Sequence, residues 1–164
     1  MIAIISDTHD NVFAIRKAVE MLLDLKPNKV YHLGDIIAPL TLHDFNGLPM
    51  AMIIGNNDGD HEMLKKIIKS KGWDYLGKKK SLTIDGKEFF LTHGTDPLTI
   101  ERAVKSKKYT YVLHGHTHVL EDRRVGKTRI LNPGAFYPTV EDKTFMTLEP
   151  KNDTVTVYSV SRGD

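Results

Sequence analysis

Side chains that can bind metal ions recur at five places in the sequence, each directly after a short β-rich run. The groups are Asp7-Thr8-His9, Gly34-Asp35, Gly55-Asn56-Asn57-Asp58, His93-Gly94 and Gly115-His116-Thr117-His118. The chain contains no cysteine, so a metal ion would be held by nitrogen and oxygen atoms rather than by thiolates. Together the five groups indicate metal-dependent chemistry.

The spacing within two of these groups suits a shared ligand role. Residues two apart in an extended chain project to the same side, so Asp7 and His9, or His116 and His118, could reach one ion or two neighbouring ions. Taken singly, each group has an ordinary alternative: the acidic residues could lie in turns or cap helices, and His93 could be a structural histidine. Paired imidazoles at His116 and His118 are the strongest single motif, because they are a common ligand pair.

The elements that must position these groups alternate in the first half of the chain. The β-rich runs cover residues 2–6, 29–33 and 51–54, and helical patterns cover residues 11–25 and 62–71. This alternation predicts βαβ units and a parallel sheet. Ligands of such sheets bind beyond the carboxyl ends of the strands, so we expect the groups to meet in space.

The second half of the chain has the pattern of hairpins. Runs 81–84 and 88–92 flank Asp85-Gly86, a typical two-residue hairpin turn. Further β-rich runs cover residues 109–113, 119–125, 128–131, 144–148 and 155–160. We expect two packed sheets with helices outside, in a single domain spanning residues 1–164, since the chain falls short of the roughly 200 residues needed for two domains.

Composition narrows the class of function. The net charge of +2 comes from 23 basic and 21 acidic residues, so no field of one sign favours nucleic acid or an anionic membrane. The lysine-rich segments 78–80 and 105–108 are interpreted as solvated turns. Residues 1–7 lack a basic region and are too short for a signal peptide or a membrane span, so a cytoplasmic protein is expected.

In their order along the chain, the five groups resemble the motif set of the calcineurin-like metallophosphoesterase family: D-x-H, G-D, G-N-H-D or a variant, H-G and G-H-x-H. Asn132-Pro133-Gly134 matches the Asn-Pro-Gly segment of that family. The resemblance covers nearly the whole chain and is closest to the small stand-alone phosphodiesterases of bacteria and archaea. It implies a four-layer αββα sandwich of two mixed β-sheets flanked by helices, in the α/β (α+β) class.

The resemblance also implies two metal sites that share Asp35. The first site would contain Asp7, His9, Asp35 and His118, and the second Asp35, Asn56, His93 and His116. Nitrogen and oxygen ligands suit Mn, Fe, Co, Ni or Zn, and Mn is expected by resemblance. A water bridging the two ions would lose a proton near neutral pH and, as hydroxide, attack a phosphodiester.

Position 57 departs from the family pattern. Asn57 stands where many members have a histidine thought to help the leaving group depart, and an amide cannot give up a proton. Efficient turnover is therefore expected only for esters with acidic leaving groups. Asp58 would orient that histidine in the family, and here it could instead cap the helix that contains Met63. Asn11 could contact phosphate or serve as the N-cap of the helix that follows it.

Several alternatives stay open at this point. The chain could be a metal-binding interaction scaffold with weak catalysis, or a nuclease or phosphomonoesterase of the same family. Phe136 and Tyr137 could wall the substrate pocket or pack in the core. A small phosphodiester is the expected substrate, nucleic acid and membranes are not expected partners, and exposed strand edges could pair in a homo-oligomer. Four histidines lie outside the motif set and are not expected to bind catalytic metal: His32, His43, His61 and His114.

Overall fold

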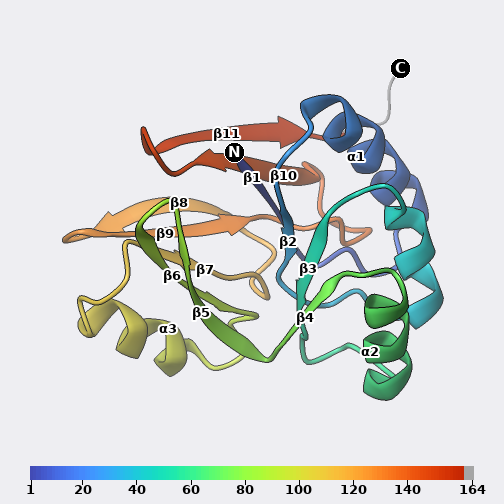
Figure 1. The fold of residues 1–164 in the computed structure, drawn as a ribbon, viewed down its shortest axis with the longest axis horizontal. Coiled ribbons are helices and arrows are strands. Elements are labelled where there is room, and N and C mark those ends of the chain that lie inside the picture. The colour runs from blue at the N-terminus through green and yellow to red at the C-terminus, as the bar shows by residue number, and fades with distance from the viewer. Residues whose placement is uncertain (161–164) are drawn as a thin grey trace.

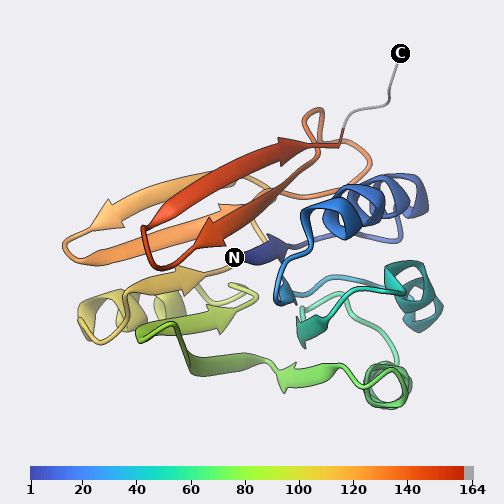
Figure 2. The ribbon, with the colours of Figure 1, turned by 45° about the horizontal axis from the view of Figure 1, so that its top comes forward.

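Two β-sheets face each other with helices on both outer sides in the computed structural model of the protein, which describes residues 1–160 (Figures 1 and 2). The helices α1 (Val12–Leu25) and α2 (His61–Ser70) cover one outer side, together with the 3-10 helix η1 (Pro39–Phe45). The helix α3 (Pro97–Lys105) lies on the other. The expected αββα sandwich of two mixed sheets is confirmed.

The first sheet has six strands in the order β11-β10-β1-β2-β3-β4. Its parallel part contains β1 (Ile2–Ile5), β2 (Val30–His32), β3 (Met50–Ile53) and β4 (Asp74–Gly77). The hairpin of β10 (Thr144–Glu149) and β11 (Thr154–Ser159) adds antiparallel strands beside β1. The first strand of the chain therefore lies in the middle of this sheet.

The second sheet has five strands in the order β5-β6-β7-β9-β8. They are β5 (Lys79–Ile84), β6 (Lys87–Thr92), β7 (Tyr111–Leu113), β8 (Leu120–Val125) and β9 (Thr128–Pro133). β7 runs parallel to both β6 and β9, and the outer strands pair antiparallel. Asp85 and Gly86 both have positive φ in the β5–β6 turn, as a two-residue hairpin of the expected kind requires.

Burial on both faces explains why β1 is apolar throughout. Ile4 packs between the two sheets, whereas Ile5 packs beneath α1, and neither side chain is exposed. α1 buries Ile15, Val19 and Leu22 at the spacing of one helical face. The apolar pattern thus fixes which side of the first sheet carries α1 and which side meets the second sheet.

Three elements were not expected from the sequence: η1, β4 and α3. α3 begins at Pro97 after Asp96, whose side chain accepts a hydrogen bond from the Leu98 amide. The expectation of solvated turns at the two lysine-rich segments is wrong in part. Lys79 and Lys80 pair with β6 as the start of β5, and Lys105 is the last residue of α3. Their side chains are exposed, as expected of lysine.

Within residues 1–160, no helix combines the length and the apolar character needed to cross a membrane.

Candidate metal centre

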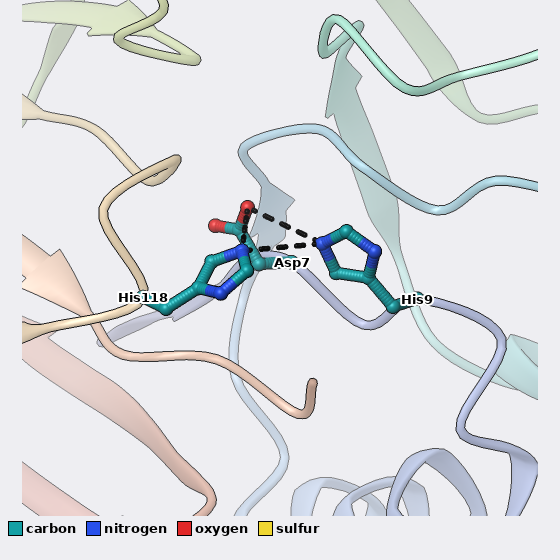
Figure 3. Close-up of side chains that lie close together, drawn as sticks. All are labelled: Asp7, His9 and His118. Carbon is teal, nitrogen blue, oxygen red and sulfur yellow. Dashed lines mark hydrogen bonds and ion pairs between the residues drawn. The ribbon is translucent and has the colours of Figure 1, made fainter. Parts of the chain in front are cut away.

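The loops that follow β1, β2, β6 and β7 bring their polar side chains to one end of the two sheets. Two groups of side chains have ligand atoms that all lie within 4.8 Å of one another: Asp7, His9 and His118, and Asp7, Asp35 and His93. Figure 3 shows Asp7 and His9, from the loop after β1, and His118, from the loop after β7, pointing toward one another. We refer to these five residues as the candidate metal centre.

The distances place the carboxylates between the imidazoles. Oδ1 of Asp7 is 3.4 Å from Nε2 of His118 and 3.9 Å from Nε2 of both His9 and His93. Asp35 directs Oδ2 to His9 at 3.5 Å and Oδ1 to His93 at 3.4 Å. The family resemblance implied Asp35 as the shared residue. In the structure Asp7 is common to both groups, and Asp35 also lies between two imidazoles.

Two buried polar atoms of the candidate metal centre lack a hydrogen-bond partner. Among the described residues, Oδ1 of Asp7 and Nε2 of His93 are the buried side-chain atoms in this state. A buried polar atom without a partner costs free energy, so native proteins rarely retain one unless it serves a ligand. A divalent cation would be coordinated by both atoms, and an oxygen and nitrogen donor set suits first-row metals. The residues therefore fit a divalent ion.

The carboxylates of the candidate metal centre are held in their charged form. Burial by itself would raise the pKa of Asp7, but contacts with His9 and with the Ser6 hydroxyl hold that pKa below its ordinary value. Burial likewise opposes ionisation of Asp35, yet the imidazole of His93 at 3.4 Å and the hydrogen bonds from Asn57 bring the pKa of Asp35 well below the ordinary range. Burial lowers the pKa of His118, which favours the neutral imidazole that binds metal.

The other two predicted ligands lie at the edge of this arrangement. The ring of His116 is 5.2 Å from the ring of His93, and its backbone N–H donates to Oδ2 of Asp7 at 2.9 Å. Asn56 is exposed, and its Oδ1 accepts a hydrogen bond from the hydroxyl of Thr95 at 3.1 Å. The structure thus brings together most of the predicted ligand set, with Asn56 turned toward Thr95.

Asn57 contacts the carboxylate of Asp35 directly. Its backbone N–H donates to Oδ1 at 2.9 Å, and its Nδ2 donates to Oδ2 at 2.7 Å. The side chain at the predicted leaving-group position therefore also orients the carboxylate that faces His9 and His93. The sequence offered no signal for this contact, because an amide two residues after Gly55 has many uses.

Asp58 does not cap the helix α2, and that expectation is wrong. Asp60 is the N-cap, and its Oδ1 accepts from the Met63 amide at 2.9 Å. The buried carboxylate of Asp58 accepts hydrogen bonds from four backbone N–H groups of the loops after β2 and β3, at 2.6–3.1 Å. They belong to Asp35, Ile36, Ile37 and Gly55. Asp58 thus holds the loop that presents Asp35.

The ligand loops adopt backbone conformations that L-residues rarely use. Positive φ values of 42° to 66° occur at five of the seven predicted ligands: Asp7, His9, Asp35, His116 and His118. Such conformations persist where the surroundings hold them, and they concentrate at functional sites. The backbones also approach closely: a Cβ on Gly55 would stand 2.2 Å from Oδ1 of Asp35, and one on Gly115 would stand 2.4 Å from Oδ2 of Asp7. Only glycine fits there.

Asn132 holds the loop that carries His116 and His118. The side chain is fully buried, and its Nδ2 donates to the Gly115 carbonyl and to the Thr117 hydroxyl, each at 3.0 Å. Its Oδ1 accepts from the Gly134 amide at 3.0 Å. The Asn-Pro-Gly segment, recognised by resemblance alone, therefore has a structural use as a brace between two loops.

Of the remaining residues singled out from the sequence, some support the fold and one borders the candidate metal centre. Asn11 caps α1 through the Ala14 amide at 3.2 Å and donates to the Phe136 carbonyl at 2.8 Å, which supports its capping alternative. Phe136 is fully buried in the core. The ring of Tyr137 lies 4.6 Å from that of His9 and 4.9 Å from that of His118, so Tyr137 borders the candidate metal centre.

An open cavity of about 550 Å³ lies over the candidate metal centre. It is lined by residues from five loops: His9, Asp10, Ile37, Asn57, His118, Tyr137 and Pro138. This volume is in the range of small-molecule sites.

His32 lies beneath the loop of Gly34 and Asp35 as a neutral imidazole. Its Nδ1 accepts from the Gly34 amide at 3.1 Å, so the proton is on Nε2, which lies 3.0 Å from the Thr8 hydroxyl. A second ring proton would face the Gly34 N–H. Burial lowers the pKa of His32 to about 4, although the carboxylate of Asp58 acts in the other direction.

Asp58 and Asp60 form a matched pair for a test of loop support. Asp58→Ala leaves four backbone donors without their acceptor, so we expect the free energy of unfolding to fall by about 3 kcal/mol. Mn²⁺ binding should weaken at least tenfold. Asp60→Ala should cost about 1 kcal/mol, the value of one helix cap, and leave Mn²⁺ binding unchanged.

Urea unfolding of metal-free protein and titration calorimetry with Mn²⁺ measure both effects. Asp58→Asn, which keeps the shape of the side chain, serves if the alanine variant does not fold. Equal effects of the Asp58 and Asp60 variants would contradict the assigned role of Asp58.

His32 predicts a pH dependence of stability in the metal-free protein. The pKa of His32 in the folded protein lies below the ordinary value of 6.5. Between these two pKa values, His32 is protonated in the unfolded state but neutral in the folded state. This contribution to stability is present above pH 6.5 and is lost as the pH falls toward 4, by about 3 kcal/mol in all.

The non-titrating variant His32→Asn keeps an acceptor for the Gly34 amide. Its free energy of unfolding between pH 6.5 and 4 should therefore fall less steeply than that of the wild type. If the free energy of unfolding of the two proteins has the same pH dependence, His32 takes up a proton as readily in the folded state as in the unfolded state.

Known proteins are similar to this chain in both sequence and fold. Residues 1–153 match the calcineurin-like phosphoesterase superfamily domain. The chain is 37% identical to the phosphodiesterase MJ0936 of Methanocaldococcus jannaschii over 136 residues, which cover 81% of this chain and 82% of that protein. The structure of an archaeal phosphodiesterase superposes with a TM-score of 0.91 at 31% identity, covering 96% of this chain and 98% of the other.

The similarity to a more distant structure concerns the fold alone. The zinc complex of Vps29 from Entamoeba histolytica has a TM-score of 0.71 and 22% identity, covering 99% of this chain and 94% of Vps29. Because the family domain matches residues 1–153 and a phosphodiesterase is 37% identical over 81% of this chain, the chain belongs to the calcineurin-like phosphoesterase superfamily.

Proposed function

We propose that this protein is a metal-dependent phosphodiesterase that acts on a small phosphodiester with two divalent ions. The observation that carries the proposal is the pair of buried, ionised carboxylates, Asp7 and Asp35, set among imidazoles with two polar atoms unpaired. The phosphodiesterase relative supports the reaction class. Such a centre suits attack at phosphorus better than a purely structural role, since the cavity above it is open to solvent.

The first ion would be held by Asp7, His9, Asp35 and His118. The second would be held by Asp35, Asn56, His93 and His116. Asp7 is a further candidate ligand for this ion, because its Oδ1 lies 3.9 Å from Nε2 of His93. Mn²⁺ is our proposal for both ions, with Ni, Co, Fe or Zn as alternatives that share the same ligand preferences. When bound, two such ions supply a hydroxide nucleophile at neutral pH and neutralise the phosphate oxygens.

The protein's own groups position the substrate and the ligands. His9 and His118 line the cavity, so a phosphoryl group bound at the candidate metal centre would lie beside them. Asn57 lines the same cavity and donates to both oxygens of Asp35, so its amide fixes that carboxylate rather than supplying a proton. The cavity is open to solvent, which suits a diester with two arms, and its volume of about 550 Å³ holds a small ester.

Removal and return of metal test the reaction. Metal-free protein should not hydrolyse bis(p-nitrophenyl) phosphate, and Mn²⁺ should restore activity, with Ni, Co, Zn and Mg compared one at a time. The diester should be preferred over p-nitrophenyl phosphate. Asp35→Ala should lower kcat/KM by roughly 10³-fold because it removes the carboxylate between the two groups.

Asp24→Ala, at an exposed aspartate of α1, is the matched control and should leave activity unchanged. Preference for the monoester would identify a phosphatase instead. Binding of two ions without hydrolysis of either ester would favour a protein-interaction scaffold.

Asn57→His tests the absence of a general acid. The wild type should hydrolyse aryl esters well and alkyl esters slowly, because Asn57 cannot protonate a poor leaving group. The histidine variant should accelerate alkyl esters by about 10²- to 10⁴-fold, the usual effect of general acid catalysis, and change aryl esters little. The measurement is kcat/KM over a series of leaving groups of rising pKa. Parallel series for the two proteins would show that position 57 does not govern the leaving group.

A further inference from the structure

Ile37 has a backbone conformation that suits glycine rather than isoleucine. Its φ is 86°, and it is the one β-branched residue with positive φ among residues 1–160. A branched Cβ in this region clashes with the backbone, so the conformation is unfavourable. Retention of isoleucine at this position needs a use for its side chain.

The backbone around Ile37 is fixed by its neighbours. Its N–H donates to Oδ1 of Asp58 at 2.9 Å, and its carbonyl accepts from the Gly59 amide at 3.2 Å. The next residue, Ala38, donates to Oδ1 of Asp10 at 3.1 Å. These bonds come from the backbone and would be made equally by a glycine, so they do not explain the side chain.

Core packing does not explain the side chain either. Ile36, the preceding residue, is fully buried in the core beneath α1, whereas Ile37 is half-buried and belongs to none of the three apolar clusters of the described chain. Ile37 lines the open cavity over the candidate metal centre, together with His9 and His118. Its side chain thus adds apolar surface to the wall of that cavity.

The polar side chains of the wall are partly engaged by the protein itself. Oδ1 of Asp10 accepts two hydrogen bonds, at 3.1 and 2.5 Å, and Nδ2 of Asn57 donates to Asp35 at 2.7 Å. Pro138 and the ring of Tyr137 also line the cavity. Ile37, Pro138 and this ring therefore add apolar surface to a wall that also carries polar groups.

We propose that Ile37, with Tyr137 and Pro138, forms a subsite for an apolar arm of the substrate, an aryl or branched alkyl group on the phosphorus. This inference rests on the proposed function, because it takes the phosphoryl group to lie at the candidate metal centre. The strained backbone places the Ile37 side chain at the cavity, and burial of an apolar arm against it favours such esters.

Two unreactive phosphonates isolate the arm from the chemistry. Phenylphosphonate and methylphosphonate carry the same anionic group and differ only in the arm. Titration calorimetry on Mn²⁺-loaded wild type should give about tenfold tighter binding of phenylphosphonate, from the extra apolar area buried. Ile37→Gly should bring the two affinities to within about threefold by weakening phenylphosphonate alone, and Ile37→Val should retain the preference.

Stability provides the second readout. Metal-free Ile37→Gly should unfold within about 4 °C of the wild type or above it, because relief of strain offsets the lost side chain. Ile36→Ala, at the neighbouring core position, should lower Tm by about 10 °C. A comparable fall in Ile37→Gly would assign Ile37 to the core and overturn the subsite.

The outcomes separate this inference from the proposed function. Equal binding of the two phosphonates by the wild type, or equal weakening of both by Ile37→Gly, overturns the subsite even if the enzyme hydrolyses diesters. Absence of metal-dependent hydrolysis overturns the proposed function, and the phosphonate preference still decides whether the subsite exists.

Discussion

The burial of two ionised carboxylates, Asp7 and Asp35, among imidazoles is the constraint on which the rest of the structure depends. Like charges at close range repel each other, and their removal from water costs free energy that a cation offsets. In place of water, hydrogen bonds from the surrounding chain hold the loops that carry these carboxylates and imidazoles. Asp58 binds the loop of Asp35 through its backbone amides, and Asn132 braces the loop of the two late histidines. Asp58 and Asn132 thus fix the loops that carry the residues of the candidate metal centre.

The sequence predicted the layers and the convergence of ligands because both follow from local rules. Apolar runs buried on both faces define β1 to β3, and polar groups after them must meet at the carboxyl edge of the sheet. Asp85-Gly86 identified its hairpin because a turn of that length demands positive φ. The ordered motifs likewise identified the family, because their polar residues follow different strands in a fixed order along the chain.

What the sequence did not predict depends on long-range pairing. β4 (Asp74–Gly77) lacks the alternation of a half-buried strand and forms because β3 supplies its partner. α3 is nine residues long and begins at Pro97, so it is too short for a clear helical pattern in the sequence. Asp58 and Asp60 both precede α2, and only the tertiary structure shows that one caps the helix and the other holds the loops. The contact of Asn57 with Asp35 joins two strands' ends and has no local signature.

The central position of β1 has a consequence for folding. β1 pairs with β2 on one side and with β10, from the far part of the chain, on the other. Asp7 and His118 likewise come together from opposite sheets. Such nonlocal contacts form late and slowly, since long loops must close first. In a partly folded chain the candidate ligands therefore lie apart, and a divalent ion would bind almost entirely to the folded state. Such an ion would stabilise the protein against unfolding and would not nucleate folding.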